Sequence, residues 1–498
     1  MFDTLPHKIE DFMDWPWSQI EPFFQDLAAR PLTADTLDDW LADWTGIAAR
    51  VMETQARLYV ATTQDTTDEE AEARYHAFLE NVVPAAEAAD QQLKEKLLAS
   101  RLEPERFAVP LRNLRAEADL FRAENLPLQT QERKITSEFN RIMGTQTITW
   151  EGEEITLMQV VPLLRNPDRA VRERAWRLRS ERFLADRERV NALWKQYMDL
   201  RRQIARNAGY DDYRSYRWQL LKRFDYTPQD SFTFQAAIEE VVVPAQQRIY
   251  ERRRQRLGLE TLRPWDLTVD PDGKPPIKPY DTVDELETKA GTIFRRVDPQ
   301  LGDYYDTLRR EGLLDLPNRP GKGPGAYSTG FAYSQRPFIF MNAVGDNSEV
   351  RTLLHETGHA FHGFEARKLP YHQQWRAPME FNEVASMAME LLAAPYLHTS
   401  EGGFYGDTDY ARALVQELER IVLFWPYMAV VDAFQHWVYE NHDAATHPDN
   451  CDTKWAKLWD RFMVGIDFTG LEEHRANGWH RKRHIHRTPF YYIEYGLA

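Results

Sequence analysis

Apolar residues recur at three- and four-residue spacing along most of the chain. The pattern is clear over residues 33–63 and again over residues 167–210, where Pro167 stands at the start and Gly209 near the end. This spacing puts the apolar side chains on one face of an α-helix, and proline and glycine are typical of the first position and the end of helices. We therefore predict a long amphipathic helix in each segment.

Strand patterns are few. Residues 147–157 alternate apolar and polar side chains around a glycine-containing turn, which predicts a β-hairpin, and residues 336–342 form a short apolar run that favours a strand. We interpret the glycine-rich residues 321–330 as a flexible loop and the Pro, Asp and Gly of residues 263–280 as a long connection between helical blocks. Long helices with two small β elements predict a mainly α protein.

Composition narrows the class of protein and its partners. The chain has 498 residues, 43% of them hydrophobic, so a packed protein of two or more domains, or of one large multilobed unit, is expected. The net charge of −16 disfavours nucleic acid and anionic membranes as partners. Cys451 is the only cysteine, the N-terminus lacks the pattern of a signal peptide, and no apolar run approaches the length of a membrane span. We therefore expect a cytoplasmic protein.

The string NSEVRTLLHETGHAFH carries the clearest candidate chemistry. Asp346 and Glu349 have the spacing of a capping box, so a helix is expected to start near residue 347. His355 and His359 then lie one turn apart on the same face, where two imidazole nitrogens can meet one tetrahedral Zn²⁺. Glu356 lies about 100° further round, which suits a general base acting on water.

A catalytic zinc needs a third protein ligand and an open fourth position. Residues 377–397 offer three acidic candidates, and Glu383 lies deepest in their apolar helical run, where a charge needs a partner. We favour Glu383 over Glu380, and Glu390 lies on a nearby face and stays an alternative.

The last twenty residues combine histidines with tyrosines. Phenol and imidazole donors can stabilise the oxyanion that forms in peptide hydrolysis, although the residues alone fit an aromatic core with solvated histidines better. The candidates are His480, His484, His486, Tyr491, Tyr492 and Tyr495.

Three strings, HETGHAFH, FNEVAS and PFYYIEYGLA, together resemble the oligoendopeptidase F branch of the thimet-oligopeptidase family of zinc metallopeptidases. The resemblance begins near residue 136, so we expect an N-terminal helical region over residues 1–135 and a zinc-peptidase catalytic region over residues 136–498. Members of the family usually continue past the third string with further helices. This chain ends at Ala498, and we expect its catalytic region to lack them.

The resemblance implies two helical lobes around a deep substrate channel, with a small β-sheet beside a zinc site. It implies one Zn²⁺ per chain, held by His355, His359 and Glu383, with Glu356 as the base. An edge of the sheet would pair with an extended peptide, and residues 336–342 are the strand that we expect to do so.

The resemblance also implies that residues of the tail donate hydrogen bonds during catalysis. It assigns Tyr495, Tyr492 and His484 to the oxyanion, while Tyr491 and His486 stay open because the match in the tail is loose by one residue.

We therefore expect a zinc-dependent endopeptidase that hydrolyses short oligopeptides, with the acidic surface favouring basic ones. The alternatives are a zinc carboxypeptidase of similar helical-channel fold and an inactive peptide-binding homologue. The sequence leaves the oligomeric state open.

Overall fold

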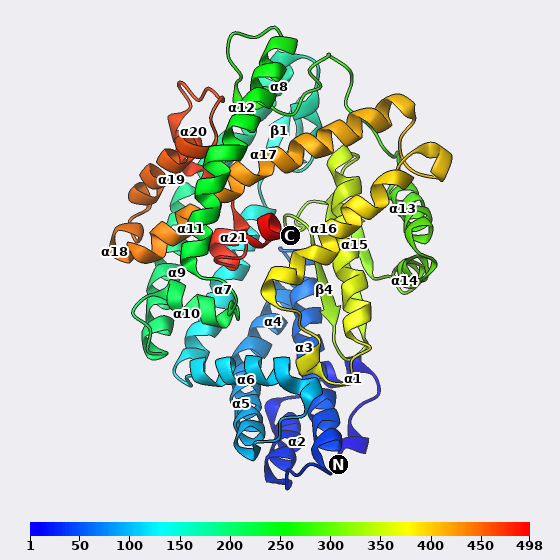
Figure 1. Cartoon of the computed structure of the whole chain (residues 1–498), viewed down its shortest axis with the longest axis vertical. Helices are drawn as coiled ribbons and strands as arrows, with labels where there is room; N and C mark the ends of the chain where they lie inside the picture. Colours follow the sequence, from blue (N-terminus) through cyan, green and yellow to red (C-terminus); the bar gives the residue numbers. More distant parts are fainter.

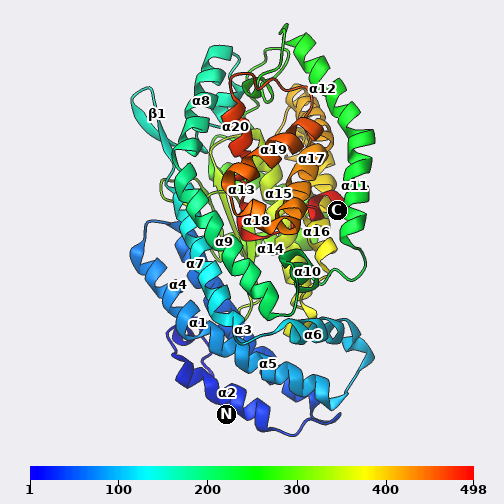
Figure 2. The same cartoon turned by 90° about the vertical axis from the view of Figure 1, so that its left-hand side faces the viewer.

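The mainly α fold predicted from the sequence is confirmed by the computed structural model, which describes residues 1–498. The N-terminal helices form one end of the molecule (Figures 1 and 2). They pack around a core that includes Trp40 and Trp44, and the helix expected over residues 33–63 is α3. These helices are α1 (Ile9–Met13), α2 (Trp17–Ala29), α3 (Leu37–Gln64), α4 (Glu69–Asn81), α5 (Val83–Ser100) and α6 (Ala108–Leu120).

A second group of helices forms one side of the remaining body, and its longest member, residues 407–440, extends across to the other side (Figure 1). Its core joins middle and C-terminal segments, with Trp194 of α9 close to Trp479. The helices are α7 (Asn125–Gly144), α8 (Arg169–Ala185), α9 (Arg187–Asn207), α10 (Tyr213–Leu220), α11 (Pro228–Ala237), α12 (Val243–Arg256), α17 (Asp407–Glu440), α18 (His442–Ala445), α19 (Pro448–Phe462), α20 (Glu472–Ala476), α21 (Arg483–Arg487) and α22 (Glu494–Leu497).

The prediction of a single helix over residues 167–210 is wrong, because the helix is interrupted at Asp186, between α8 and α9. The Asp186 carboxylate is buried, accepts a hydrogen bond of 2.8 Å from Gln146 and pairs with Arg182 and Arg189. A short acidic side chain that finds such partners favours a helix end over a helix interior.

The opposite side of the body combines helices with a three-stranded sheet. It contains α13 (Val283–Val297), α14 (Pro299–Arg310), α15 (Asn347–Ala366), α16 (Asn382–Ala393), β3 (Leu314–Pro317), β4 (Tyr327–Phe331) and β5 (Arg336–Ala343). The predicted hairpin is confirmed as β1 (Thr147–Trp150) and β2 (Glu153–Thr156), which pair antiparallel. No helix combines the length and the hydrophobicity needed to cross a bilayer.

The sheet has the order β3-β5-β4, with β3 parallel and β4 antiparallel to β5. The expectation that residues 336–342 form the free edge is therefore wrong, because β5 is the central strand and pairs on both sides. Its apolar run reflects burial of both its faces in the interior. The edge strands are β3 and β4, and it is β4 that lines a cavity. Because β4 starts at Tyr327, the interpretation of residues 321–330 as a loop throughout is also wrong.

Two cavities lie between the two sides of the body, as expected for two helical lobes around a channel. The larger, of about 870 Å³, is half apolar in its lining residues and extends along α15, α16 and α17. The smaller, of about 520 Å³, is mostly polar and follows β4 from Ala326 to Gly330. His355 and Glu356 of α15 line both cavities.

Candidate active site

The helix α15 begins where the sequence predicts. The Asp346 side chain accepts a hydrogen bond of 2.8 Å from the Ser348 amide, and Glu349 accepts one of 2.9 Å from the Asp346 amide, which completes the capping box. Glu349 also accepts from Tyr280. This cap fixes the start of the helix only three residues after β5, so the histidines two turns later face the sheet.

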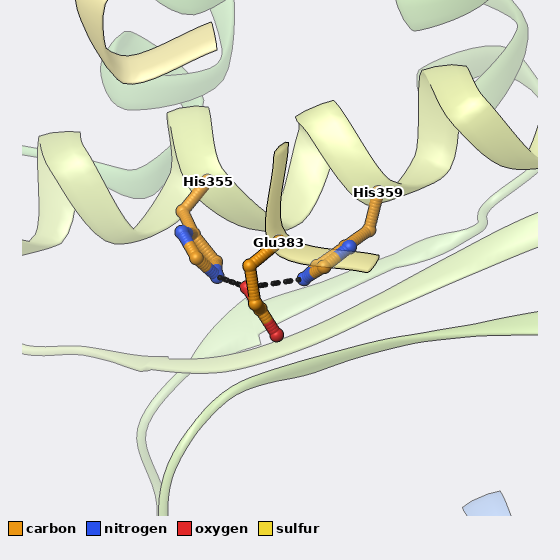
Figure 3. A group of neighbouring side chains, drawn as sticks. All are labelled: His355, His359 and Glu383. Atoms are coloured by element: carbon orange, nitrogen blue, oxygen red, sulfur yellow. Dashed lines mark ion pairs between the residues drawn. The ribbon is translucent and has the colours of Figure 1, made fainter. Parts of the chain in front are cut away.

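Three candidate metal ligands converge on one point (Figure 3). One oxygen of Glu383, Oε2, lies 3.2 Å from His355 Nε2 and 3.3 Å from His359 Nε2. Ligand atoms at 2.0–2.1 Å from a tetrahedral Zn²⁺ are separated by about 3.3–3.4 Å. The donor set of two imidazoles and one carboxylate, at this spacing, fits Zn²⁺.

Close packing of α16 on α15 brings Glu383 to the histidines. A Cβ at Gly358 would lie 2.6 Å from the Ala385 carbonyl oxygen and from Ser386 Cα, so only glycine permits this approach. Glu383 is 1% exposed, and Ser386 Oγ donates a hydrogen bond of 2.9 Å to its Oε2. Glu380 lies in the short turn before α16 and is not part of the converging group.

A second carboxylate lies behind His355. Glu390 Oε1 is 2.7 Å from His355 Nδ1, and Arg420 donates a hydrogen bond of 3.0 Å to Glu390 Oε2. Glu390, the alternative to Glu383 in the sequence, therefore orients the His355 imidazole instead, an arrangement typical of histidines that bind metals. Burial lowers the pKa of His355, but hydrogen bonds to Glu383 and Glu390 outweigh it and raise the pKa to about 9.

Glu356 is buried between α15 and the edge of the sheet, and it is 7% exposed. Burial raises the pKa of its carboxyl, while the charges of His355 and His359 and a hydrogen bond from the Ser328 amide oppose that shift. The group thus stands beside the candidate ligands and opposite the middle of β4, within both cavities. A carboxylate with a raised pKa at such a place can accept a proton from water.

The tail reaches the same region through His484, Tyr491 and Tyr495. His484 Nε2 lies 3.3 Å from the Tyr495 hydroxyl, and the Tyr495 ring lies 6.1 Å from the His355 ring. Tyr491 donates a hydrogen bond to Glu383 Oε1. Burial and then Glu383 raise the pKa of each of these two tyrosines, so both hydroxyls keep their protons and act as donors.

Tyr492 packs against this group, with its ring 4.8 Å from the His484 ring and 5.3 Å from the Tyr495 ring. Its ring lies under Lys482, whose Nζ is 3.5 Å from the ring centre, and it lines only the larger cavity. His480 and His486 are 2% and 0% exposed and line neither of the two cavities. The structure thus brings His484, Tyr492 and Tyr495 together and leaves His480 and His486 elsewhere.

Tyr491 and Glu390 contact the candidate ligands although sequence reasoning left both as secondary alternatives. Tyr491 carries no signal in the sequence that separates it from the other histidines and tyrosines of the tail. Glu390 does, because it follows Glu383 by seven residues, two turns along the same helix face.

Comparison with known proteins now identifies the family. Helical lobes, with two histidines on one helix and a glutamate on the next, are typical of a class of helical metallopeptidases. The sequence model of peptidase family M3 matches residues 162–498. The model of the peptidase M3 N-terminal domain matches residues 12–107. The chain belongs to peptidase family M3, and the resemblance stated from the three strings is confirmed.

Curated relatives match over shorter stretches. Oligopeptidase PepF of Bacillus subtilis is 30% identical over 159 residues, which cover 31% of this chain and 23% of that protein. An oligoendopeptidase F homolog of Borreliella burgdorferi is 28% identical over 165 residues, 32% of this chain and 27% of that protein. The chain therefore spans about a quarter of the length of these relatives.

Solved structures match over nearly the whole chain. An X-ray structure assigned to oligoendopeptidase F is 25% identical, with a TM-score of 0.91, and the match covers 99% of this chain and 86% of that one. Pz peptidase A in complex with an inhibitor is 26% identical, with a TM-score of 0.89, covering 100% of this chain and 87% of that one. The fold class is confirmed by both.

Proposed function

We propose that the protein is a zinc-dependent endopeptidase that hydrolyses short oligopeptides. The observation that carries this proposal is the convergence of His355, His359 and Glu383 beside Glu356, directly opposite an open strand edge. Family membership supports peptide hydrolysis, and the curated relatives carry the names oligopeptidase and oligoendopeptidase. All of these residues lie within residues 136–498, the proposed catalytic region.

The three ligands would hold one Zn²⁺, which when bound supplies a Lewis acid for the scissile carbonyl and lowers the pKa of water. Glu390 and Tyr491 orient His355 and Glu383 from behind. Glu356 takes the proton of the attacking water and passes it to the leaving amine. Tyr495 and His484 donate hydrogen bonds to the oxyanion, and Tyr492, in the larger cavity, is proposed as a weaker contributor to the same step.

An extended peptide would lie along β4. The Ser328 amide points to Glu356 and so away from β5. Backbone amide and carbonyl groups point to alternate sides along a strand, so those of Ala326 and Gly330 also point away from β5. A peptide that pairs with these groups would be held through its backbone, whatever its sequence. Such a site, between two lobes, accepts an unfolded peptide of roughly ten residues and excludes a folded protein.

Mass spectrometry of the products from a mixed peptide pool tests the proposal. Internal cuts that need added zinc, with a stable folded protein spared, are the expected result. Release of single C-terminal residues would instead select the zinc carboxypeptidase. Peptide binding without turnover at full zinc content would select the inactive binding homologue.

A further inference from the structure

We infer that Arg483 and Arg487 bind a carboxylate of the substrate on the C-terminal side of the scissile bond. The inference rests on the proposed function and adds a substrate class to it: peptides that carry a carboxylate after the cut, either the free C-terminus or an acidic side chain.

The two arginines lie one turn apart on α21, so their side chains leave the same face of the helix. Both line the smaller cavity together with His355, His359 and Glu356. Arg483 donates a hydrogen bond to the Pro324 carbonyl, and a Cβ at Gly325 would collide with its Nη1. The guanidinium of Arg487 lies 4.9 Å from the centre of the Tyr59 ring.

Neither guanidinium forms an ion pair with a carboxylate of the chain, and Arg487 makes no hydrogen bond to a protein acceptor. Two further arginines line the cavity, and of these Arg367 is also without a carboxylate partner and stacks on the Trp375 ring at 4.1 Å, whereas Arg336 is paired. Arg336, in the same cavity, lies 2.6 Å from Glu311. The carboxylates that line the cavity are Glu356 and Glu383, and both already serve the candidate catalytic centre.

Two like charges in a concave site oppose each other. Burial lowers the pKa of Arg483, and the neighbouring charge of Arg487 lowers it further. A planar carboxylate matches the fork geometry of guanidinium groups and would relieve this repulsion. The pair therefore creates a local preference for anionic groups inside a chain whose net charge of −16 favours basic peptides at long range.

We place the peptide antiparallel to β4, and this placement sets its direction. An antiparallel peptide runs from the Gly330 end of the strand toward Gly325, and its scissile bond lies near Ser328, opposite Glu356. Residues after the cut then pass Arg483, which contacts Gly325, while residues before it pass Arg367, whose Nη2 would lie 2.8 Å from a Cβ at Gly330. The two arginines of α21 thus face the C-terminal half of the substrate.

The first experiment compares substrates on the unaltered, zinc-loaded protein. One neutral peptide is prepared as the C-terminal acid and as the C-terminal amide, and the amide form is also made with Asp or Asn at each position after the cut. We expect the best carboxylate-bearing peptide to show a KM lower by roughly 10–100-fold than its neutral match, with kcat changed little, as for charged hydrogen bonds that bind ground and transition states alike. A preference in the acid and amide pair assigns the terminal carboxylate, and one in the Asp and Asn pair assigns a side chain.

The second experiment locates that preference in the protein. Arg487→Gln should reduce the ratio of KM values by on the order of tenfold, and Arg487→Lys should restore part of it. Arg481→Gln removes the same charge from an exposed position of the same segment, and Arg367→Gln removes it from the opposite end of β4. Both controls should keep the ratio of the unaltered protein.

Failure of the inference and failure of the proposed function are separable. Equal KM values for all matched peptides, or a preference that follows Asp before the cut or Arg367, would overturn the inference while cleavage stands. Fluorescence anisotropy of labelled acid and amide peptides on the Glu356→Gln protein gives the same comparison without turnover. An acid preference in binding, with no cleavage by the unaltered protein, would overturn the endopeptidase and support the carboxylate site.

Discussion

Two pairs of histidines, which look alike in the sequence, have opposite surroundings in the fold. His355 and His359 share an oxygen of Glu383 at 3.2 and 3.3 Å, and both line a cavity. His480 and His486 instead lie inside an aromatic core. The His486 ring stacks on Phe139 at 4.5 Å, and the His480 ring lies 4.2 Å from Trp479.

The pKa values of the two regions separate accordingly. Neighbouring carboxylates outweigh burial and raise the pKa of His355 to about 9, whereas burial lowers the pKa of His486 to about 3. One environment attracts a positive charge and the other excludes it. The number of nearby histidines therefore says little about metal binding, and a carboxylate that shares their cavity says much more.

Replacement of one histidine from each pair by alanine should give the largest difference, measured as bound zinc. His359→Ala should abolish bound zinc and peptide cleavage, because two ligands do not hold a catalytic zinc. His486→Ala should keep about one zinc per chain. Elemental analysis of both purified proteins checks the prediction, and full zinc in His359→Ala would contradict the assigned ligands.

Removal of the base from between the two ligands comes next. Glu356→Gln keeps the size and hydrogen bonding of the side chain, so zinc should stay bound. We expect kcat to fall at the upper end of, or beyond, the roughly 10²–10⁴-fold typical of acid–base groups. Steady-state kinetics with one quenched peptide measures this, and a normal kcat would rule out the proposed role.

The tail offers a comparison among tyrosines. Tyr495→Phe should lower kcat by roughly 10²–10³-fold with little change in KM, because the lost donor acts only in the transition state. Tyr492→Phe should have a clearly smaller effect, because Tyr492 does not line the smaller cavity that holds His359 and Glu383. Kinetics of the two variants, with zinc content and folding checked, decides the matter. Equal losses would mean that both phenols reach the oxyanion.

The carboxylate behind His355 should matter for affinity more than for chemistry. Glu390→Gln keeps an acceptor for the imidazole but removes its charge, and we expect zinc affinity to fall about 10–100-fold. Competition with a chelator of known affinity measures the change. Unchanged affinity would show that Arg420 and Glu390 only serve packing.

The smallest effect is a pH dependence of stability from His486. Its folded pKa of about 3 lies below the ordinary value of 6.5, so below pH 6.5 the unfolded chain takes up a proton that the folded protein refuses. The unaltered protein therefore loses stability as pH falls from about 6.5 toward 3. His486→Leu should avoid a loss of about 2 kcal/mol between pH 7 and pH 5. Urea unfolding at both pH values, with parallel curves for the two proteins as the contrary outcome, tests it.

Local chemistry made much of the site predictable. The capping box and the one-turn spacing of His355 and His359 depend only on helix geometry, and Glu383 stood out as a charge in an apolar run. Strand order depends on residues far apart, so the apolar β5 was mistaken for the edge. The edge strand β4, YSTGF, looks like a loop because its outward groups line a polar cavity.

The arginines of α21 were equally hidden. In the string HRKRHIHR, a guanidinium that faces a cavity cannot be told from one that faces solvent, since both belong to a charged, helix-compatible pattern. The difference comes from Pro324 and Tyr59, which contact Arg483 and Arg487 from segments more than 150 residues away.

The position of β4 also bears on aggregation. An open strand edge that pairs with any backbone is a template for the growth of sheets between molecules, and many proteins protect such edges with lysine, proline or a bulge. Here, the groups of Ala326, Ser328 and Gly330 face a cavity walled by α15 and α21. Another folded copy cannot reach them, whereas a single unfolded strand can. The two lobes therefore restrict access to the unpaired backbone groups of β4, which lowers the risk that copies of the protein join through their sheets into fibres.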